Sequence, residues 1–261
     1  MPALTAKDLY AQLYDLRVPD WPGELDFYLY FLSRTPESSQ GILEIACGTG
    51  RVTLPLSKAG YKMAGLDIST ELLEIARKKS AGMADPDWVQ ADMRTFELKR
   101  KFGVVISPGH SFQFMNTPEE QVQCLQQVKR HLIPGGWLIL HLDHQDVRWL
   151  ADLLEQQGEP YKPGSINQHP ETHKMFRYSN YWTYEPSTQS ATSHCIWEEL
   201  SSDGSVSGTW RMEPTRLHCA FHSEMEHLLR RCGFTVQTLY GDFNGNPLAE
   251  NSENMIWVAR L

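Results

Sequence analysis

Short apolar runs alternate with helical segments along residues 41–143, and this alternation constrains the fold more than any other feature of the chain. Five runs have the length and aliphatic content of buried strands, at residues 41–46, 62–67, 88–92, 104–107 and 137–142. Helices are expected between them, at residues 51–59, after the N-cap candidate Ser69, and at residues 121–132. The pattern predicts an α/β fold with a doubly wound, mostly parallel sheet.

The flanking segments have a different texture. Residues 1–35 predict an N-terminal helical cap, interrupted by the Pro- and Gly-containing stretch 17–23. Residues 160–220 are rich in aromatic residues and predict three antiparallel strands inserted after strand five, at residues 174–184, 190–200 and 206–220. Beyond a helix at 221–231, residues 235–240 and 255–261 predict an antiparallel pair that completes seven strands. The chain, residues 1–261, is therefore expected to form a single domain.

Charge and cysteine usage narrow the class of partner. The net charge is −8, without a basic stripe, which argues against nucleic acid as a partner. The five cysteines are scattered without C-x-x-C spacing, which fits a reducing cytoplasm better than a disulfide framework or a zinc site. No apolar run approaches membrane-spanning length, so no membrane partner is expected. A small-molecule partner is expected, and a homodimer contact is an alternative use of the aromatic strands.

A Gly-rich turn, Glu44-Ile45-Ala46-Cys47-Gly48-Thr49-Gly50, joins the first strand to a helix. Its few side chains would let a ligand touch the backbone, whose amides can hold polar groups. The dinucleotide fingerprint G-x-G-x-x-G does not fit, because Ala46 and Arg51 occupy two of its glycine positions. A phosphate-binding loop does not fit either, because Lys-Ser/Thr does not follow Gly50. An ordinary strand-to-helix turn is the alternative.

Two acids follow the next two predicted strands: Asp67 ends the second and Asp92 the third. Ligands of doubly wound sheets bind at the carboxyl ends of the strands. There Asp67 can accept both hydroxyls of a ribose, and Asp92 can reach an adenine edge. A cap or turn role is the alternative for each acid, but two acids after a Gly-rich turn favour a nucleoside site.

These residues resemble the motifs of class I S-adenosylmethionine-dependent methyltransferases, with segment 44–50 as the first motif, 67–69 as the second and 92–93 as the third. Residues 132–136 are similar to the turn before the family's fifth strand. The resemblance implies a Rossmann-like sheet and S-adenosyl-L-methionine as cofactor, with Ala46 in place of the usual first glycine. The turn would contact the methionine part, Asp67 the ribose and Asp92 the adenine amino group. The implied cofactor-binding residues are Tyr14, Trp21, Glu44, Ala46, Gly48, Gly50, Asp67, Ile68, Asp92, Met93 and Ser107.

Residues 13–15, Trp21 and the β-rich insertion are similar to a narrower group, which includes glycine and amino-sugar N-methyltransferases. The resemblance implies that Tyr14 and Trp21 close over the cofactor; core anchors are the alternative. It also implies an enzyme that methylates an N or O nucleophile of a small molecule.

The end of strand four, residues 107–112, is expected to face the transferred methyl group. It lacks the Pro-Pro-aromatic motif of enzymes that methylate bases or glutamine, and the paired glutamates of protein arginine methyltransferases, so a small acceptor is favoured. His110 is the catalytic candidate, as a base or a hydrogen-bonding group; a loop histidine bonded to backbone is the alternative. The candidate substrate-binding residues are His144, Trp182, Trp197 and Arg211, and residues 160–220 are expected to form an acceptor-side lid.

No metal is expected, because neighbouring residues of segment 141–146 would point to opposite faces of a strand. Two other functions stay open. A non-catalytic S-adenosylmethionine-binding module would carry the same motifs, and an assay is needed to distinguish it. A nucleotide-dependent oxidoreductase on a Rossmann sheet is disfavoured, because Arg51 stands where its third glycine would be.

Overall fold

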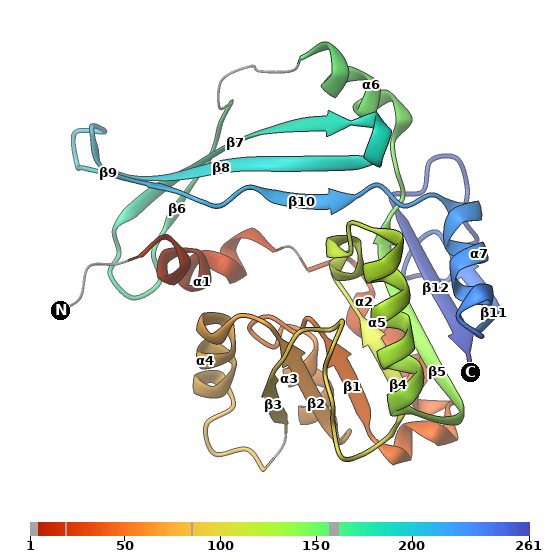
Figure 1. Cartoon of the computed structure of the whole chain (residues 1–261). Coiled ribbons are helices and arrows are strands. Elements are labelled where there is room, and N and C mark those ends of the chain that lie inside the picture. Colours follow the sequence, from red (N-terminus) through yellow and green to blue (C-terminus); the bar gives the residue numbers. More distant parts are fainter. Residues whose placement is uncertain (1–4, 19, 85, 157–161) are drawn as a thin grey trace. The chain divides into compact units, whose positions relative to one another are not determined.

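The computed structural model describes residues 5–18, 20–84, 86–156 and 162–261, so the first residues of the predicted cap and of the predicted lid lie outside the described residues. The described chain forms two compact units, whose elements are labelled in Figure 1. We call residues 20–145 and 219–261 the core unit. The described parts of residues 1–19 and 146–218 are the insertion unit.

The core unit contains a seven-stranded sheet in the order β11-β12-β5-β4-β1-β2-β3. Strands β3, β2, β1, β4 and β5 run parallel, whereas β12 is antiparallel to both β5 and β11. The predicted doubly wound, mostly parallel sheet is therefore confirmed. The strands are β1 (Ile42–Ile45), β2 (Met63–Asp67), β3 (Asp87–Gln90), β4 (Phe102–Ser107), β5 (Leu132–Asp143), β11 (Thr235–Tyr240) and β12 (Asn254–Arg260).

Helices of the core unit cover both faces of this sheet. On β4, Val105 packs into a cluster with α5 and α7, while Val104 packs into a second cluster with α2 and α3. Because neighbouring strand residues point to opposite faces, one continuous apolar run supplies both cores. The helices are α2 (Glu24–Ser33), α3 (Thr53–Lys58), α4 (Thr70–Lys79), α5 (Pro118–His131) and α7 (His222–Arg231), with short 3₁₀ turns η1 (Pro36–Gln40) and η2 (Ser111–Phe114).

Local signals set several boundaries. Ser69 caps α4 as predicted, because its hydroxyl accepts a hydrogen bond from the amide of Leu72 at 3.2 Å. Strand β5 begins earlier than predicted, at Leu132, which pairs with Phe102 of β4. The turn residues 134–136 lie inside this strand, where the register shifts and Gly135 has a φ of 75°.

The insertion unit is an antiparallel sheet with two helices, and it contains five strands rather than the predicted three. Strand β6 was not predicted, because residues 162–168 contain Pro, Gly and Asn and read as a loop. The predicted strand 206–220 divides at Pro214, which has no backbone N–H to donate. The elements are α1 (Ala6–Arg17), α6 (Val147–Glu155), β6 (Lys162–Gln168), β7 (Met175–Glu185), η3 (Pro186–Thr188), β8 (Ser190–Leu200), β9 (Val206–Arg211) and β10 (Thr215–His218).

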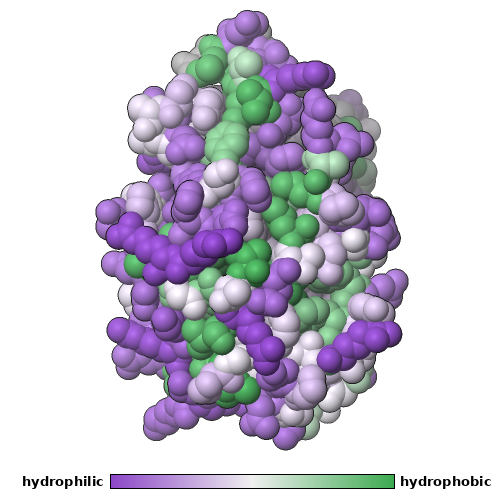
Figure 2. Space-filling view, turned by 90° about the vertical axis from the view of Figure 1, so that its right-hand side faces the viewer, coloured by the Kyte–Doolittle hydropathy of each residue, from purple (hydrophilic) through white to green (hydrophobic). Residues whose placement is uncertain are grey.

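Polar side chains cover much of the face drawn in Figure 2. On the face drawn in Figure 2, apolar side chains form scattered groups separated by polar ones. Within the described part of the chain, no helix is both long and apolar enough to cross a membrane.

Candidate functional site

The Gly-rich turn after β1 depends on left-handed backbone conformations. Ala46, Gly48 and Gly50 have φ values of 56°, 56° and 82°. A Cβ atom on Gly50 would lie 2.6 Å from the ring of Trp88, so this position needs glycine for space as well as for its dihedral angle. Ala46 adopts this left-handed conformation although it has a side chain, which costs a residue other than glycine on the order of 1 kcal/mol.

Asp67, the last residue of β2, holds this turn in place. The amide of Gly48 donates to Asp67 Oδ2 at 2.7 Å, and the amide of Ser69 donates to Oδ1 at 2.8 Å. Burial raises the pKa of Asp67, and these backbone hydrogen bonds oppose that rise. The neighbouring Ile68 side chain is 65% exposed, so an apolar surface for a ring lies beside the carboxylate.

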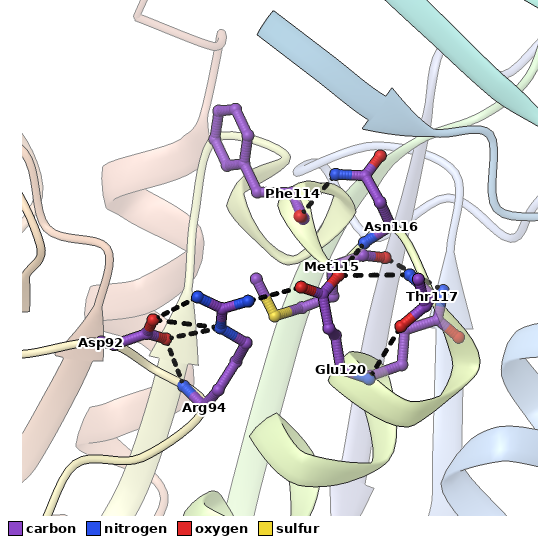
Figure 3. Close-up of polar contacts among 8 residues, drawn as sticks. Asp92, Arg94, Phe114, Met115, Asn116, Thr117 and Glu120 are labelled. Carbon is purple, nitrogen blue, oxygen red and sulfur yellow. Dashed lines mark hydrogen bonds and ion pairs between the residues drawn. The ribbon is translucent and has the colours of Figure 1, made fainter.

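Asp92 lies two residues beyond the end of β3, and its carboxylate accepts several hydrogen bonds from Arg94 (Figure 3). Arg94 Nε donates to both carboxylate oxygens at 3.0 Å, and Nη2 donates to Oδ2 at 2.5 Å. The hydrogen bonds from Arg94 hold the pKa of Asp92 below its usual value, so the acid is ionised at neutral pH. No pattern in the sequence pointed to Arg94.

Arg94 also contacts a second acidic side chain. Arg94 Nη1 donates to Glu120 in the first turn of α5. Glu120 Oε2 also accepts from the amide of Asn116 at 2.9 Å, and Thr117 completes a capping box with it. These contacts connect the loop after β3 to the start of α5. Met93, which lies between Asp92 and Arg94 in the chain, is 9% exposed.

Beyond β4, two histidines and an asparagine meet. His110 has a left-handed backbone with a φ of 63°, and its Nε2 lies 3.0 Å from His141 Nε2 on β5. The His141 Nε2 atom lies 2.7 Å from Asn254 Oδ1, at the start of β12. Burial lowers the pKa of His110 to about 4 and lowers that of His141 well below its usual value, so both rings are neutral at pH 7.

The hydrogen bonds of this histidine cluster fix the tautomer of His141. The backbone N–H of Gly109 donates to His141 Nδ1 at 3.2 Å, so that nitrogen carries no proton. His141 Nε2 must then carry the proton and donate to Asn254 Oδ1. His110 Nε2 lies 3.0 Å from the same His141 nitrogen and 3.4 Å from Asn254 Oδ1, so the two rings and the amide oxygen form one hydrogen-bonded group.

Trp21 packs on these histidines within the core unit. Its ring centroid lies 5.1 Å from that of His110 and 4.9 Å from that of His141. The guanidinium of Arg51 lies over the same indole, 4.9 Å from its centroid, and forms an ion pair with the buried Glu24. The predicted closure of Trp21 over a cofactor stays a prediction.

Two buried groups border the turn. Glu44 on β1 is 3% exposed; burial raises its pKa to about 8, and the hydroxyl of Thr53 donates to it. Glu44 is thus largely protonated at neutral pH. Ser107, at the end of β4, is fully buried, and its hydroxyl has no hydrogen-bond partner among the described residues. A buried hydroxyl without a partner is uncommon, and a bound ligand is one way to satisfy it.

The remaining predicted residues are spread over both units. In the core unit, His144 Nδ1 bonds the carbonyl of Ser252 at 2.8 Å. In the insertion unit, Tyr14 on α1 packs edge-on against Tyr10, and Trp182 packs edge-on against Trp149. Trp197 is fully buried in that unit, and Arg211 is exposed. Their contacts with an acceptor stay predictions. Among residues 5–18, 20–84, 86–156 and 162–261, no group of three or more His, Cys, Asp or Glu side chains is placed to hold a metal.

Residues 42–136 match the family model described as a methyltransferase domain. A dTDP-3-amino-3,4,6-trideoxy-alpha-D-glucopyranose N,N-dimethyltransferase of Streptomyces venezuelae is 37% identical over 136 residues, which cover 50% of this chain and 56% of that protein. The matched segment thus spans little more than half of that relative. A putative methyltransferase of Bacillus subtilis is 23% identical over 96% of this chain and 95% of its own length.

A crystal structure of an S-adenosylmethionine-dependent methyltransferase from Clostridium acetobutylicum shares the fold. The TM-score is 0.78 at 16% identity, over 97% of this chain and 96% of that one. The matched family segment begins at β1 and includes the Gly-rich turn, Asp67, Asp92 and His110, so the geometry and the comparisons point to the same part of the core unit.

Proposed function

Residues 42–136 form a class I methyltransferase domain of the S-adenosylmethionine-dependent kind, and on that premise we propose that the chain methylates the amino group of a small molecule, with an amino sugar as the first candidate. The observation that carries the choice of nitrogen is the neutral histidine cluster beside the end of β4. Burial lowers the pKa of His110 to about 4, which makes it too weak a base to ionise a hydroxyl. A neutral amine needs no such base, because it attacks with its own lone pair.

The residues around the Gly-rich turn fit the cofactor. Asp67 presents a carboxylate where two ribose hydroxyls can donate, and Ile68 exposes an apolar surface for the adenine ring. Ser107 offers an unpaired buried hydroxyl at the end of β4. When bound, S-adenosylmethionine would supply an electrophilic methyl group on a sulfonium. Asp92 and Met93 would border the adenine, and Glu44, Gly48 and Gly50 would shape the turn.

His110 would orient the acceptor. Its imidazole would form a hydrogen bond with a hydroxyl or ring oxygen of the acceptor, while His141 and Asn254 contact the ring at Nε2. The relative from Streptomyces venezuelae acts on a dTDP-linked amino sugar by its name, and this supports an amine on a sugar. The proposal also includes a lid at residues 160–220 and acceptor contacts by His144, Trp182, Trp197 and Arg211. It further includes a homodimer and a cytoplasmic location.

A labelled methyl group tests the function. The purified chain is incubated with methyl-labelled S-adenosylmethionine and dTDP-3-amino-3,4,6-trideoxyglucose, D-glucosamine or glycine, and with the same dTDP-sugar carrying a hydroxyl in place of the amine. Label is expected on an amine and not on the hydroxyl counterpart, with mass spectrometry locating it on nitrogen. Label on the hydroxyl sugar alone, or on no compound, would contradict the proposed function.

The cofactor half of the proposal is tested without turnover. Asp67→Ala is expected to weaken S-adenosylmethionine binding on the order of 100-fold in calorimetry, because two charge-assisted hydrogen bonds are lost. Asp87→Ala is the matched control, because Asp87 pairs with Arg100 on the surface at the opposite end of the parallel strands. Equal affinities for Asp67→Ala and wild type would place the cofactor elsewhere.

A further inference from the structure

We propose that Asp143 binds the protonated amino group of the acceptor and accepts its proton, so that the amine becomes a nucleophile. This inference rests on the proposed function and adds the group that His110 cannot supply. Asp143 is the last residue of β5, at the same end of the parallel strands as the Gly-rich turn. Acceptors of a doubly wound sheet are expected at that end.

The pairing of β5 with β12 places Asp143 beside the histidine cluster. Asn254 lies directly opposite Asp143, and Ile256 lies opposite His141. Residues opposite each other share a face of the sheet, and so do residues two apart on one strand. Asp143, His141 and Asn254 therefore share one face, and the proposal places the acceptor between His110 and this carboxylate.

Asp143 is held in place but has no cation of its own. Its amide donates to the side-chain oxygen of the buried Gln113 at 2.8 Å, which fixes the end of the strand. Within the described segments, no Lys or Arg forms an ion pair with its carboxylate, whereas Asp92 and Glu24 each have an arginine. A half-buried carboxylate without a cation favours a cationic ligand.

The surroundings also make this carboxylate a usable base. The pKa of Asp143 is raised to about 6, mainly by burial; His144 opposes the rise, and Glu253, which precedes β12, contributes to it. The other titratable groups near this face are His141 and His110, whose pKa values are lowered by burial, and the ion pair of Glu24 with Arg51, in which Glu24 Oε1 lies 4.0 Å from His141 Nδ1. An acceptor amine with a pKa of about 8 then lies within about 2 units of the carboxylate.

In the proposed step, the proton moves from the acceptor ammonium to the carboxylate of Asp143. An N–H bond of the ammonium breaks and an O–H bond forms on Asp143, which turns an ammonium–carboxylate pair into a neutral amine and a carboxylic acid. The freed lone pair on nitrogen would then be available to the methyl group that bound S-adenosylmethionine would supply, with the sulfur as the leaving group. The methylated product carries the positive charge, and Asp143 returns its proton to solvent.

Binding without turnover tests the recognition step. Calorimetry is run with S-adenosylhomocysteine present, using the amine that the wild type methylates and its hydroxyl counterpart. Wild type is expected to bind the amine about tenfold more tightly than the hydroxyl compound, and Asp143→Asn is expected to lose this preference while binding the hydroxyl compound normally. Asp143→Glu should keep part of the preference, which guards against a folding defect in the Asn variant.

The pH profile tests the base. For the wild type, kcat/KM is expected to fall below about pH 6, as Asp143 becomes protonated, and Asp143→Asn is expected to lose this limb and about 100-fold in kcat/KM. Glu253→Gln is the matched control, because it removes the neighbouring acid that helps to raise the pKa of Asp143: it should keep the amine preference and move the acid limb to lower pH. An unchanged amine preference or an unchanged profile in Asp143→Asn overturns the inference alone, whereas absent methyl transfer by the wild type contradicts the proposed function.

Discussion

At the scale of single residues, Ala46 occupies a position whose left-handed backbone conformation favours glycine. Its φ of 56° places a Cβ atom in the left-handed region, at a cost of about 1 kcal/mol. Ala46→Gly is therefore expected to raise the free energy of unfolding by up to about 1 kcal/mol, measured by urea denaturation. Gly48→Ala at the same φ should lower it by a similar amount. A destabilised Ala46→Gly variant would show that the methyl group of Ala46 contributes more packing than strain.

Residue spacing predicted the turn and its acids, but not their partners. Gly48, Asp67 and Asp92 are recognisable because each lies at a fixed place relative to a strand. Arg94 was missed because an arginine in a loop has no periodic pattern, and its role comes from Glu120, 26 residues away. His141 and Asn254 are 113 positions apart, so their contact depends on the order of the strands.

At the scale of elements, Arg94 couples the loop after β3 to the start of α5. Arg94→Gln is expected to raise the pKa of Asp92 toward its usual value, because the hydrogen bonds from Arg94 are the largest cause of its depression. Titration of the Asp92 carboxyl by NMR measures this. Stability should change by no more than about 1 kcal/mol, because these side chains are partly exposed. Arg100→Gln, which breaks a surface pair with Asp87, should leave the Asp92 titration unchanged.

The bounds of a strand were predicted accurately where one hydrophobic pattern continues along its whole length. The central strands β1, β2 and β4 lie within two residues of their predicted bounds, because buried parallel strands are continuous apolar runs. The insertion was predicted less well. Helix α6 follows its N-cap Asp146 and was not predicted, and strand β6 is held by pairing with β7 although its residues favour loops. Tertiary pairing overrides local preference in such strands.

At the scale of the whole molecule, Glu44 links stability to pH. Burial raises its pKa to about 8 in the folded state, above the ordinary 4.5 of an unfolded chain. The protonated form is favoured by folding, so this contribution to stability is fully present below pH 4.5 and is lost as the pH rises through 8. The melting temperature of the ligand-free protein is expected to fall between pH 6 and 9, and less so in Glu44→Gln.

Calorimetric melting at both pH values checks this, with Glu119→Gln as control, because Glu119 is an exposed acid in the first turn of α5. That control should follow the wild type. Equal losses of melting temperature in wild type and Glu44→Gln would mean that Glu44 is ionised in the folded protein at neutral pH.

The position of β12 between β5 and β11 has a consequence for biosynthesis. Asn254 leaves the ribosome 113 residues after His141, which takes roughly ten seconds at about 5–20 residues per second. During that interval the parallel strands can assemble, but the backbone of β5 has no neighbour on its outer side. An unpaired strand edge is a site of association with other chains. The nascent protein therefore passes through a stage with an open strand edge, and the pairing of β12 with β5 closes that edge and brings Asn254 to the histidine cluster in one step.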